Sequence, residues 1–417
     1  MLSRFIPLLG LCVFVGIAWL LSENRKAFPT RILLWGVGLQ FIFAVLILGI
    51  PALGVPGVFA FVFEFLNSAI SQLLSFSDEG ARFLFADLML DKHGYVFAFK
   101  ALPTILFFSA LVSVLYYLGV LQKLVSVMAR VMQKTMGTSG AESLSASANI
   151  FVGQTEAPLM VRPFVATMTR SEIMTVMTAG MATIAGGVMA AFVGLLQDAV
   201  PNIGGHLVTA SVMSAPAAIA IAKIIVPETE KPVTMGKSNV EVKIEESNIV
   251  EAAAKGTTEG LGLALNVGAM LIVFIAMIAM FNFGFSHLGQ WLGMAPDALS
   301  MQSILGFLCK PIAWLMGIDP ADITRVGTWL GEKVVLNEFV AYVHMAEAKS
   351  VLSDRSLIIA SYALCGFANF SSIGIQLGGI GAMAANQKPT LAKLGLKAMI
   401  AGNLAAYMTA AIVALLL

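Results

Sequence analysis

The chain has 417 residues, of which 58% are hydrophobic and 12% are charged, and its formal net charge is +1. In a soluble domain about a quarter of the residues are charged. This composition therefore excludes a soluble domain and predicts a polytopic membrane protein. A net charge near zero gives no overall field that would attract nucleic acid. The three cysteines, Cys12, Cys309 and Cys365, are odd in number and have no spacing typical of a disulfide framework or a zinc site.

The long apolar runs favour membrane helices over a barrel, whose strands are short and alternate in polarity. Roughly eight runs reach the length of about 20 residues that crosses a bilayer. They are residues 2–21, 31–51, 101–121, 172–197, 206–226, 259–284, 355–381 and 398–417. The first run has only Arg4 as a basic region and no small-residue cleavage site before Ser22, so we expect a spanning helix rather than a signal peptide.

Three further apolar stretches are too short, or too interrupted by polar residues, to cross the bilayer. They are residues 55–76, 142–166 and 300–350. Such segments are typically interfacial helices or re-entrant hairpins. We therefore expect an all-α polytopic membrane protein of about eight spans, with interfacial helices and re-entrant hairpins at 142–166 and about 325–349.

Basic side chains gather in the connections on one side of the predicted membrane. They are Arg25, Lys26, Arg31, Lys123, Arg130, Lys134, Arg162, Arg170, Lys223, Lys231, Lys237, Lys243, Lys255, Lys388, Lys393 and Lys397. The positive-inside rule makes this side cytoplasmic, which leaves both termini outside. The polar segment 227–258 is then predicted to be a solvated cytoplasmic linker between two halves, not a binding site.

The two halves, residues 101–226 and 259–417, repeat the same order of elements: a span, an interrupted hairpin, a span with a polar or glycine-rich centre, and a last span. The charge pattern places the first hairpin on the cytoplasmic side and the second on the outer side. Such an inverted repeat is typical of secondary transporters whose site lies near the membrane midplane. Chance is the alternative, because Gly and Pro are common in membrane helices, but the matched order of four elements argues against it.

The first hairpin carries the most polar interruption, Asn149 to Pro158. Gly153 and Pro158 bracket its polar residues, so we expect one helix to break near Val152 and another to begin near Pro158. A break inside the membrane leaves backbone groups unpaired, and a substrate and a small cation can satisfy them. Glu156, an ionisable residue among apolar segments, is by default a functional-site hypothesis.

Matching interruptions occur in the second half. The pair Asn337-Glu338 mirrors Thr155-Glu156, and polar or glycine-rich centres occur at 183–188 and 366–374. The segments GQTEAP, NEFVAY (preceded by Gly331 and Lys333) and GFANFSSI resemble the concentrative nucleoside transporters. The chain length resembles that of the bacterial members, so the resemblance is to the bacterial, sodium-coupled type. The resemblance extends from about Leu102 to the C-terminus, and three long motifs in order make it specific.

This resemblance implies a symporter that concentrates nucleosides in the cell, driven by sodium in most members and by protons in some. It implies a homotrimer in the bacterial cytoplasmic membrane, in which each protomer has a scaffold, including residues 1–100, and a mobile transport domain that moves as an elevator. We expect pyrimidine nucleosides such as uridine as substrates, with some purine nucleosides possible, sodium and membrane lipid as partners, and no organic cofactor.

Carried over by position, the resemblance also implies residue roles. The nucleobase would be contacted by Gly153, Gln154, Thr155, Glu156 and Val188. The ribose hydroxyls would be held by Glu338, Asn369 and Ser372, with Phe367 nearby. Sodium would be bound by the side chains of Asn149 and Thr183 and the carbonyls of Val152, Thr183 and Ile184. Thr183 replaces a serine that is common in the family and keeps its hydroxyl.

The chemistry of these residues suits the roles. A nucleoside is uncharged but rich in donors and acceptors, which amides and carboxylates can match. Structural alternatives remain open for each. Glu156 and Glu338 could cap helices, and Thr183 could bond back to a helix carbonyl. Asn369, Ser371 and Ser372 could hold helices together, and Phe367 could be core. Lys333 and Glu332 are expected to pair with each other or to reach the interface.

Three functions compete at this stage. A sodium-coupled nucleoside symporter leads, and a proton-coupled one is the alternative, although Asn149 and the Thr183 hydroxyl argue against it because a proton needs only a titratable carboxylate. The third is an intramembrane enzyme or a channel. The sequence has no His/Asp metal set or nucleophile–base pair, so we do not predict an enzyme. A channel would need a continuous polar lining.

Overall fold

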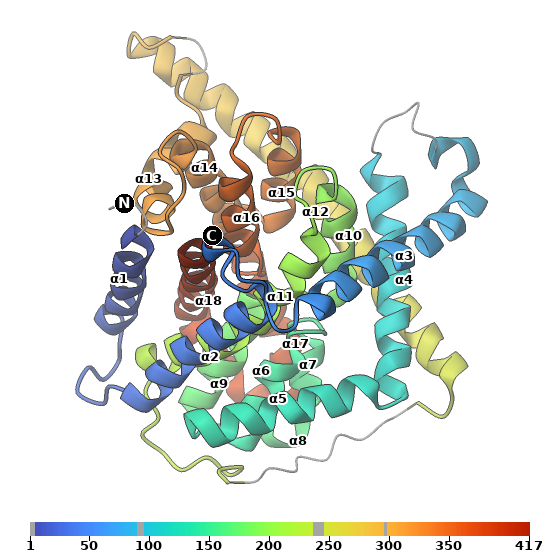
Figure 1. Ribbon diagram of the computed structural model, residues 1–417, viewed down its shortest axis with the longest axis vertical. Coiled ribbons are helices and arrows are strands. Elements are labelled where there is room, and N and C mark those ends of the chain that lie inside the picture. The colour runs from blue at the N-terminus through green and yellow to red at the C-terminus, as the bar shows by residue number, and fades with distance from the viewer. Residues whose placement is uncertain (1–4, 90–95, 237–245, 296–297) are drawn as a thin grey trace.

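The computed structural model describes residues 5–89, 96–236, 246–295 and 298–417, and these ranges are helical with no β-strand (Figure 1). The N-terminal helices are α1 (Ile6–Leu20), α2 (Thr30–Leu48), η2 (Pro51–Leu53), α3 (Ala60–Phe85), η3 (Ala86–Met89), α4 (Phe97–Tyr117) and α5 (Val120–Met136). The next are α6 (Gly140–Ala148), α7 (Glu156–Leu159), α8 (Arg162–Val165), α9 (Arg170–Ala182), α10 (Gly186–Leu196) and α11 (Ile203–Ile225). The rest are α12 (Ile249–Trp291), α13 (Met301–Leu315), α14 (Ile323–Val335), α15 (Glu338–Glu347), α16 (Asp354–Leu364), α17 (Phe370–Met383), η5 (Ala385–Gln387) and α18 (Lys388–Leu416).

The described part of the chain contains six helical segments long and apolar enough to cross a membrane. They are Thr30–Leu48, Ala98–Tyr117, Arg170–Leu196, Ile203–Ile225, Ile249–Trp291 and Ala385–Leu416. The other two predicted spans are shorter in the structure. The first is α1, with 15 residues, and the predicted span 355–381 is divided into α16 and α17. Arg4, used above to assess the first span, lies outside the described residues.

Two of the spans are broken at their centres. Helix α9 ends at Ala182, and Thr183 is already extended, with φ −122° and ψ 171°, before α10 begins at Gly186. Helix α16 ends at Leu364, and α17 begins after Asn369, whose side chain accepts a hydrogen bond from the amide of Ser372. An N-cap of this kind satisfies one of the amide groups that a helix start leaves unpaired. Both spans are therefore interrupted at the polar or glycine-rich centres that the sequence predicts.

The two hairpins lie toward opposite ends of the molecule. The first comprises α6, α7 and α8 in the lower half of Figure 1, and the second comprises α14 and α15 in the upper half. The second hairpin turns over only Leu336 and Asn337, and the side chain of Asn337 caps α15 by accepting from the amide of Val340. This placement agrees with an inverted pair of hairpins.

Helix α5 is an element that the sequence analysis did not predict, because it placed Lys123, Arg130 and Lys134 in a basic connection after the span 101–121. Its buried residues are Leu121, Val125, Ala129, Met132 and Met136, which recur on one face at helical spacing. Gly119, with φ +76°, separates α5 from α4, and Figure 1 shows α5 running sideways from the lower end of α4. This geometry is typical of an interfacial amphipathic helix.

The structure differs from the predicted solvated linker at both of its described ends; residues 237–245 lie outside the description. Thr234 is buried, its carbonyl accepts from the amide of Gly140, and its hydroxyl accepts from the amide of Ala141. The linker thus caps the start of α6. At the other end, α12 begins at Ile249 and runs for 43 residues, roughly 65 Å at about 1.5 Å per residue, so it projects beyond the hydrocarbon core.

Two helices form the buried centre of the fold. Helices α11 and α18 are buried over most of their length and pack against each other and against α9. Small residues permit this close approach: a Cβ on Gly402 of α18 would meet the Cβ of Met181 at 2.9 Å. Helices α4 and α12 instead pair at the side and expose large apolar residues such as Ile272 and Phe283, as a lipid-facing surface requires.

Candidate substrate and ion site

The tip of the first hairpin is a seven-residue turn from Asn149 to Thr155 between α6 and α7. We expected the break near Val152 and the restart near Pro158; the structure ends α6 at Ala148 and starts α7 at Glu156. A capping box of Ser139 and Glu142 fixes the beginning of α6. The turn therefore begins earlier than glycine and proline positions alone indicate, and it exposes more backbone.

Gln154 connects this turn to α17 in the other half of the chain. Its Nε2 donates to Oγ of Ser372 at 3.1 Å, and its Oε1 accepts from Nε2 of Gln376 at 3.1 Å. All three side chains are buried. The sequence analysis named Gln154 and Ser372 but missed Gln376. The available signal was its position four residues after Ser372, which places both on one face of α17.

Glu338 and Asn369 meet at the start of the same helix, α17. The amide Nδ2 of Asn369 donates to Oε2 of Glu338 at 3.0 Å, while its Oδ1 accepts from the Ser372 amide at 2.9 Å and from Oγ of Ser371 at 2.7 Å. Together with the Gln154–Ser372 bond, these contacts form one hydrogen-bonded chain from the first hairpin to the second. The structure thus brings together four of the residues assigned to base and ribose.

Thr155, Val188 and Phe367 are predicted substrate residues that lie outside this hydrogen-bonded chain. Thr155 packs against Gly379 of α17, where a Cβ would lie 2.6 Å from the Thr155 Cγ2. Val188 is fully buried near the start of α10. Phe367 is partly buried, and its backbone N–H donates to the carbonyl of Thr183 at 3.3 Å. That last bond joins the two helix breaks directly.

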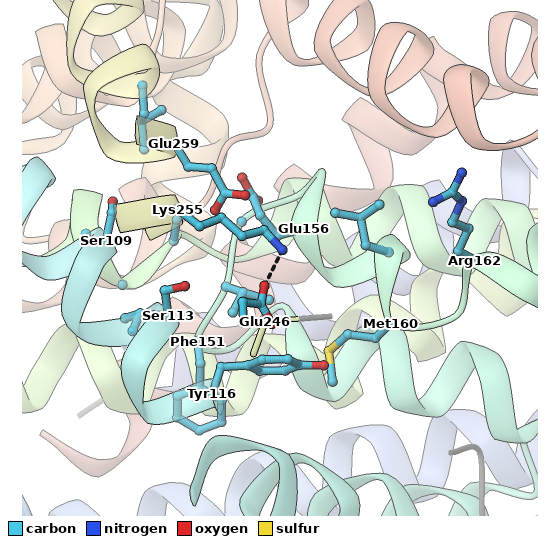
Figure 2. Close-up of a pocket in the computed structure, with 18 residues that line it drawn as sticks. Ser109, Ser113, Tyr116, Phe151, Glu156, Met160, Arg162, Glu246, Lys255 and Glu259 are labelled. Carbon is cyan, nitrogen blue, oxygen red and sulfur yellow. Dashed lines mark hydrogen bonds and ion pairs between the residues drawn. The ribbon is translucent and has the colours of Figure 1, made fainter. Parts of the chain in front are cut away.

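Glu156 lies beside a cavity of about 210 Å³ rather than in the hydrogen-bonded chain. Gly153 approaches it so closely that a Cβ there would lie 2.1 Å from Oε2 of Glu156. Figure 2 shows Lys255 and Glu259 of α12 extending toward Glu156 across the cavity, with an ion pair between Lys255 and Glu246. The sequence analysis had assigned Lys255 and Glu246 to a linker outside the site.

The predicted sodium ligands lie at the junction of the first hairpin and the α9–α10 break. Asn149, Thr183 and Ile184 are buried, and Val152 is partly buried. The Asn149 Nδ2 donates to the Ser145 carbonyl at 3.0 Å, whereas its Oδ1 has no hydrogen-bond partner among the described residues. An unsatisfied buried oxygen is costly unless something binds it, and a hard cation suits such an oxygen.

Thr183 makes the structural contact that was considered as its alternative role. Its hydroxyl donates to the carbonyl of Ala179 at 2.9 Å. That bond uses the hydroxyl proton and leaves the oxygen lone pairs, so it is compatible with cation binding.

Lys333 and Glu332 do not pair with each other or reach the interface. Lys333 is fully buried and donates to the carbonyl of Ala363 at 2.9 Å. Glu332 contacts His344 of α15 at 2.9 Å. That expectation was wrong because adjacent residues of a helix point about 100° apart, and each side chain found a partner on a different element.

Within the part of the chain that the structure describes, no group of three or more His, Cys, Asp or Glu residues could hold a metal ion. Asn149 and Thr183 offer neutral oxygen atoms, which are hard ligands of the kind that the predicted sodium site requires.

Three family models match consecutive parts of the chain. "Na+ dependent nucleoside transporter N-terminus" covers residues 9–88, "Nucleoside recognition" covers 98–199, and "Na+ dependent nucleoside transporter C-terminus" covers 206–414. Among solved structures, CNTnw in an inward-facing substrate-bound state is 40% identical with a TM-score of 0.90, covering 99% of this chain and 98% of that one. A CNTnw double variant in an outward-facing state gives a TM-score of 0.91 at 40% identity, covering 100% and 99%.

Several relatives match over almost the whole chain. An uncharacterized transporter of Haemophilus influenzae is 43% identical over 99% of this chain and 98% of its own. The transporter YutK of Bacillus subtilis is 40% identical over 97% of each. Sodium/nucleoside cotransporter 2 of Rattus norvegicus is 39% identical over 99% of this chain, which spans 63% of the rat protein. These relatives are transporters rather than enzymes. With its motifs, its broken helices and its full-length relatives in agreement, the chain belongs to the family of Na+-dependent nucleoside transporters.

Proposed function

We propose that this protein is a sodium-coupled symporter that concentrates nucleosides in the bacterial cytoplasm, with uridine and other pyrimidine nucleosides as its main substrates and some purine nucleosides also accepted. The observation that carries the proposal is the hydrogen-bonded chain Gln154–Ser372–Asn369–Glu338, which joins the two hairpins through buried polar groups. A nucleoside has a base at one end and hydroxyls at the other, so it can replace or extend such a chain.

The substrate is proposed to lie along this chain. Gln154, Thr155 and Glu156 contact the base, Gly153 allows close backbone approach, and Val188 packs on it. Glu338, Asn369 and Ser372 bind the ribose hydroxyls beside Phe367. A buried carboxylate such as Glu338 can accept from two hydroxyls, and a site built this way rejects analogues that lack them because its own groups then remain unpaired.

Sodium is proposed to bind between the first hairpin tip and the α9–α10 break. Asn149 and Thr183 supply side-chain oxygens, and Val152, Thr183 and Ile184 supply carbonyls. The unpartnered Oδ1 of Asn149 supports this assignment. Since ion and substrate share the first hairpin, each tightens binding of the other by the same factor.

Movement is proposed to follow an elevator mechanism, in which the hairpins and broken helices cross the membrane as one body against a scaffold of residues 1–100 and helices α4 and α12. The contact between α10 and α4 supports this division. Gly186 and Gly187 of α10 face Val112 and Ser109 of α4, where Cβ atoms would lie 3.2 Å and 2.9 Å away. Small residues give a smooth surface along which two bodies can slide.

The assembly is proposed to be a homotrimer with both termini outside. Exposed phenylalanines on α3, such as Phe61 and Phe65, offer an apolar face for lipid or neighbouring protomers. The cytoplasmic side is proposed from three basic connections that meet in the structure: Glu23 contacts both Arg170 and Lys397. Light scattering of the purified detergent complex tests the trimer, and cysteine accessibility near the termini tests the orientation.

The decisive test is uptake of radiolabelled uridine into proteoliposomes under an imposed sodium gradient. We expect accumulation above the external concentration, driven by sodium and unaffected by a proton gradient of equal size. Accumulation with the proton gradient alone would favour the proton-coupled alternative. Uptake that never exceeds equilibration under either gradient would refute a symporter.

A further inference from the structure

Gln376 is a fully buried glutamine on a helix that otherwise presents apolar and small residues to its surroundings. Its Nε2 makes two hydrogen bonds, to the backbone carbonyl of Met177 at 3.0 Å and to Oε1 of Gln154 at 3.1 Å. Its own Oε1 has no hydrogen-bond partner among the described residues. The two hydrogen bonds that Gln376 donates therefore hold its side chain in place, and they use both hydrogens of its amide group.

These bonds fix which way each amide points. A backbone carbonyl can only accept, so the group of Gln376 that faces Met177 must be the NH₂ and not the oxygen. The same NH₂ faces Gln154, so Gln154 must present its oxygen there. The NH₂ of Gln154 consequently points the other way, toward Ser372. The main-chain carbonyl of Met177 thus sets the orientation of the Gln154 amide, and it does so through Gln376.

Helix α9 packs closely against the side chains of Gln154 and Gln376. A Cβ on Gly180 of α9 would lie 2.8 Å from Nε2 of Gln376 and 2.9 Å from Cβ of Gln154. Any larger residue at position 180 would push the two glutamines apart. The absence of a side chain at Gly180 therefore permits the contact between the two glutamines, and Gln376 determines which way the Gln154 amide points.

We propose that Gln376 is a positioning residue that holds the Gln154 amide with its nitrogen toward the base, so that the transporter favours nucleobases carrying a carbonyl oxygen over those carrying an amino group at the same place. The proposal rests on the proposed function, which assigns Gln154 to the base. One hydrogen of the Gln154 NH₂ goes to Ser372 and the other is available to an acceptor on the base. Uridine and inosine offer such an oxygen where cytidine and adenosine carry an amine.

The test compares kcat/KM for uridine and cytidine, and for inosine and adenosine, in proteoliposomes. Wild type should favour the carbonyl-bearing member of each pair by roughly fivefold or more, because a site that donates to a group discriminates against a base without an acceptor there. In Gln376→Leu the Gln154 amide can rotate, so both ratios should fall toward one. The change should come mainly from KM for uridine and inosine, and the half-saturating sodium concentration should stay within about twofold.

Gln387→Leu is the matched control. Gln387 is also a buried glutamine that donates to two main-chain carbonyls, those of Val165 and Met168, but it does not contact Gln154. Its removal should leave both ratios unchanged. Gln376→Met, which fills the same space with an unbranched chain, repeats the test if the leucine variant does not fold, and thermal unfolding of each purified variant identifies that case.

A double variant separates positioning from packing. In a Gln154→Leu background, Gln376→Leu should alter neither ratio further, because the residue through which it acts is gone. Unchanged ratios in transport-competent Gln376→Leu and Gln376→Met would overturn the inference. So would equal loss of all four nucleosides in folded variants while Gln387→Leu remains active. Failure of the wild type itself to accumulate any nucleoside with sodium would instead refute the proposed function.

Discussion

Asn369 and Glu338 are joined by a bond whose direction the backbone determines. The Nδ2 of Asn369 donates to Oε2 of Glu338 at 3.0 Å, and it must be the nitrogen because Oδ1 already caps α17 by accepting from the Ser372 amide at 2.9 Å. Both side chains are buried. The start of α17 therefore positions the carboxylate of Glu338 as a hydrogen-bond acceptor. Ser372, which accepts a hydrogen bond from Gln154, lies in the first turn of the same helix.

Glu338→Gln tests this acceptor role. The glutamine can still accept from Asn369 with its oxygen, but it then turns an NH₂ group toward the ribose where a carboxylate oxygen stood. We expect kcat/KM for uridine to fall by about 100-fold, or about 2.7 kcal/mol, as measured by proteoliposome uptake. Glu347→Gln, at the exposed end of the same helix α15, is the control and should transport normally. Normal uridine uptake by Glu338→Gln would remove the ribose assignment.

Asn149→Leu tests the proposed sodium site. The substitution removes Oδ1, which has no protein partner among the described residues, and it keeps the approximate volume of a buried side chain. We expect the sodium concentration for half-maximal uridine uptake to rise by at least about tenfold, equivalent to about 1.4 kcal/mol. Asn386→Leu changes an exposed asparagine and should leave it unaltered. Wild-type sodium dependence in Asn149→Leu would contradict the ligand assignment.

Local chemistry made the interruptions of the helices predictable. Glycine, proline and capping residues at 149–158, 337–338 and 366–374 announced breaks, and the structure has breaks at all three places. Polarity patterns also indicated which residues could face a substrate. Polarity patterns could not predict which of these residues contact each other. The Gln154–Ser372 and Gln376–Gln154 hydrogen bonds join residues more than 200 positions apart, and only the packed fold brings them together.

The misjudged elements share a physical cause. Helix α5 follows α4 after a turn at Gly119, and its residues were counted as a basic connection because of Lys123, Arg130 and Lys134, although its apolar residues share one buried face. Lys255 was counted as a charge of the solvated linker, but α12 begins early enough to place it, with Glu259, beside the cavity that Glu156 lines (Figure 2). In both cases composition was judged without the helical face on which each residue lies, and that face decides its environment.

Lys223→Met tests a buried ion pair beneath the first hairpin. Nζ of Lys223 lies 2.7 Å from Oε2 of Glu142 and donates to Oγ of Ser171 at 3.0 Å, and the side chains of Lys223 and Glu142 are nearly inaccessible. Removing the lysine leaves a buried carboxylate without its main counter-charge, which costs about 3–5 kcal/mol. We therefore expect a clearly lower Tm in detergent than for the wild type.

A second substitution tests whether the charge, and not the packing, is responsible. Glu142→Gln in the Lys223→Met background removes the orphaned charge, while the glutamine oxygen can still accept from the Ser139 amide and preserve the cap of α6. We expect the double variant to recover much of the lost Tm. A double variant that is less stable than Lys223→Met alone would show that the lysine acts through packing.

Glu23→Gln tests the ion-pair cluster that ties three connections together on one side of the molecule. Arg170, by hydrogen bonding, and Lys397 lower the pKa of Glu23 from 4.5 to about 2. A carboxyl group whose pKa is lower in the folded state stabilises the fold above its unfolded pKa, and this contribution disappears as the pH falls from 4.5 to about 2. The difference in Tm between wild type and Glu23→Gln should accordingly be constant above about pH 5.5 and shrink as the medium is acidified.

The size of this difference depends on solvent, because all three side chains are partly exposed. Salt screens such pairs, so raising the ionic strength should reduce the difference at neutral pH. In an Arg170→Gln background, the partner that lowers the pKa of Glu23 most is gone, so Glu23→Gln should then produce a smaller Tm difference with weaker pH dependence. A Tm difference that grows on acidification, or that persists unchanged without Arg170, would show that Glu23 stabilises the protein by some means other than its pairing with these cations.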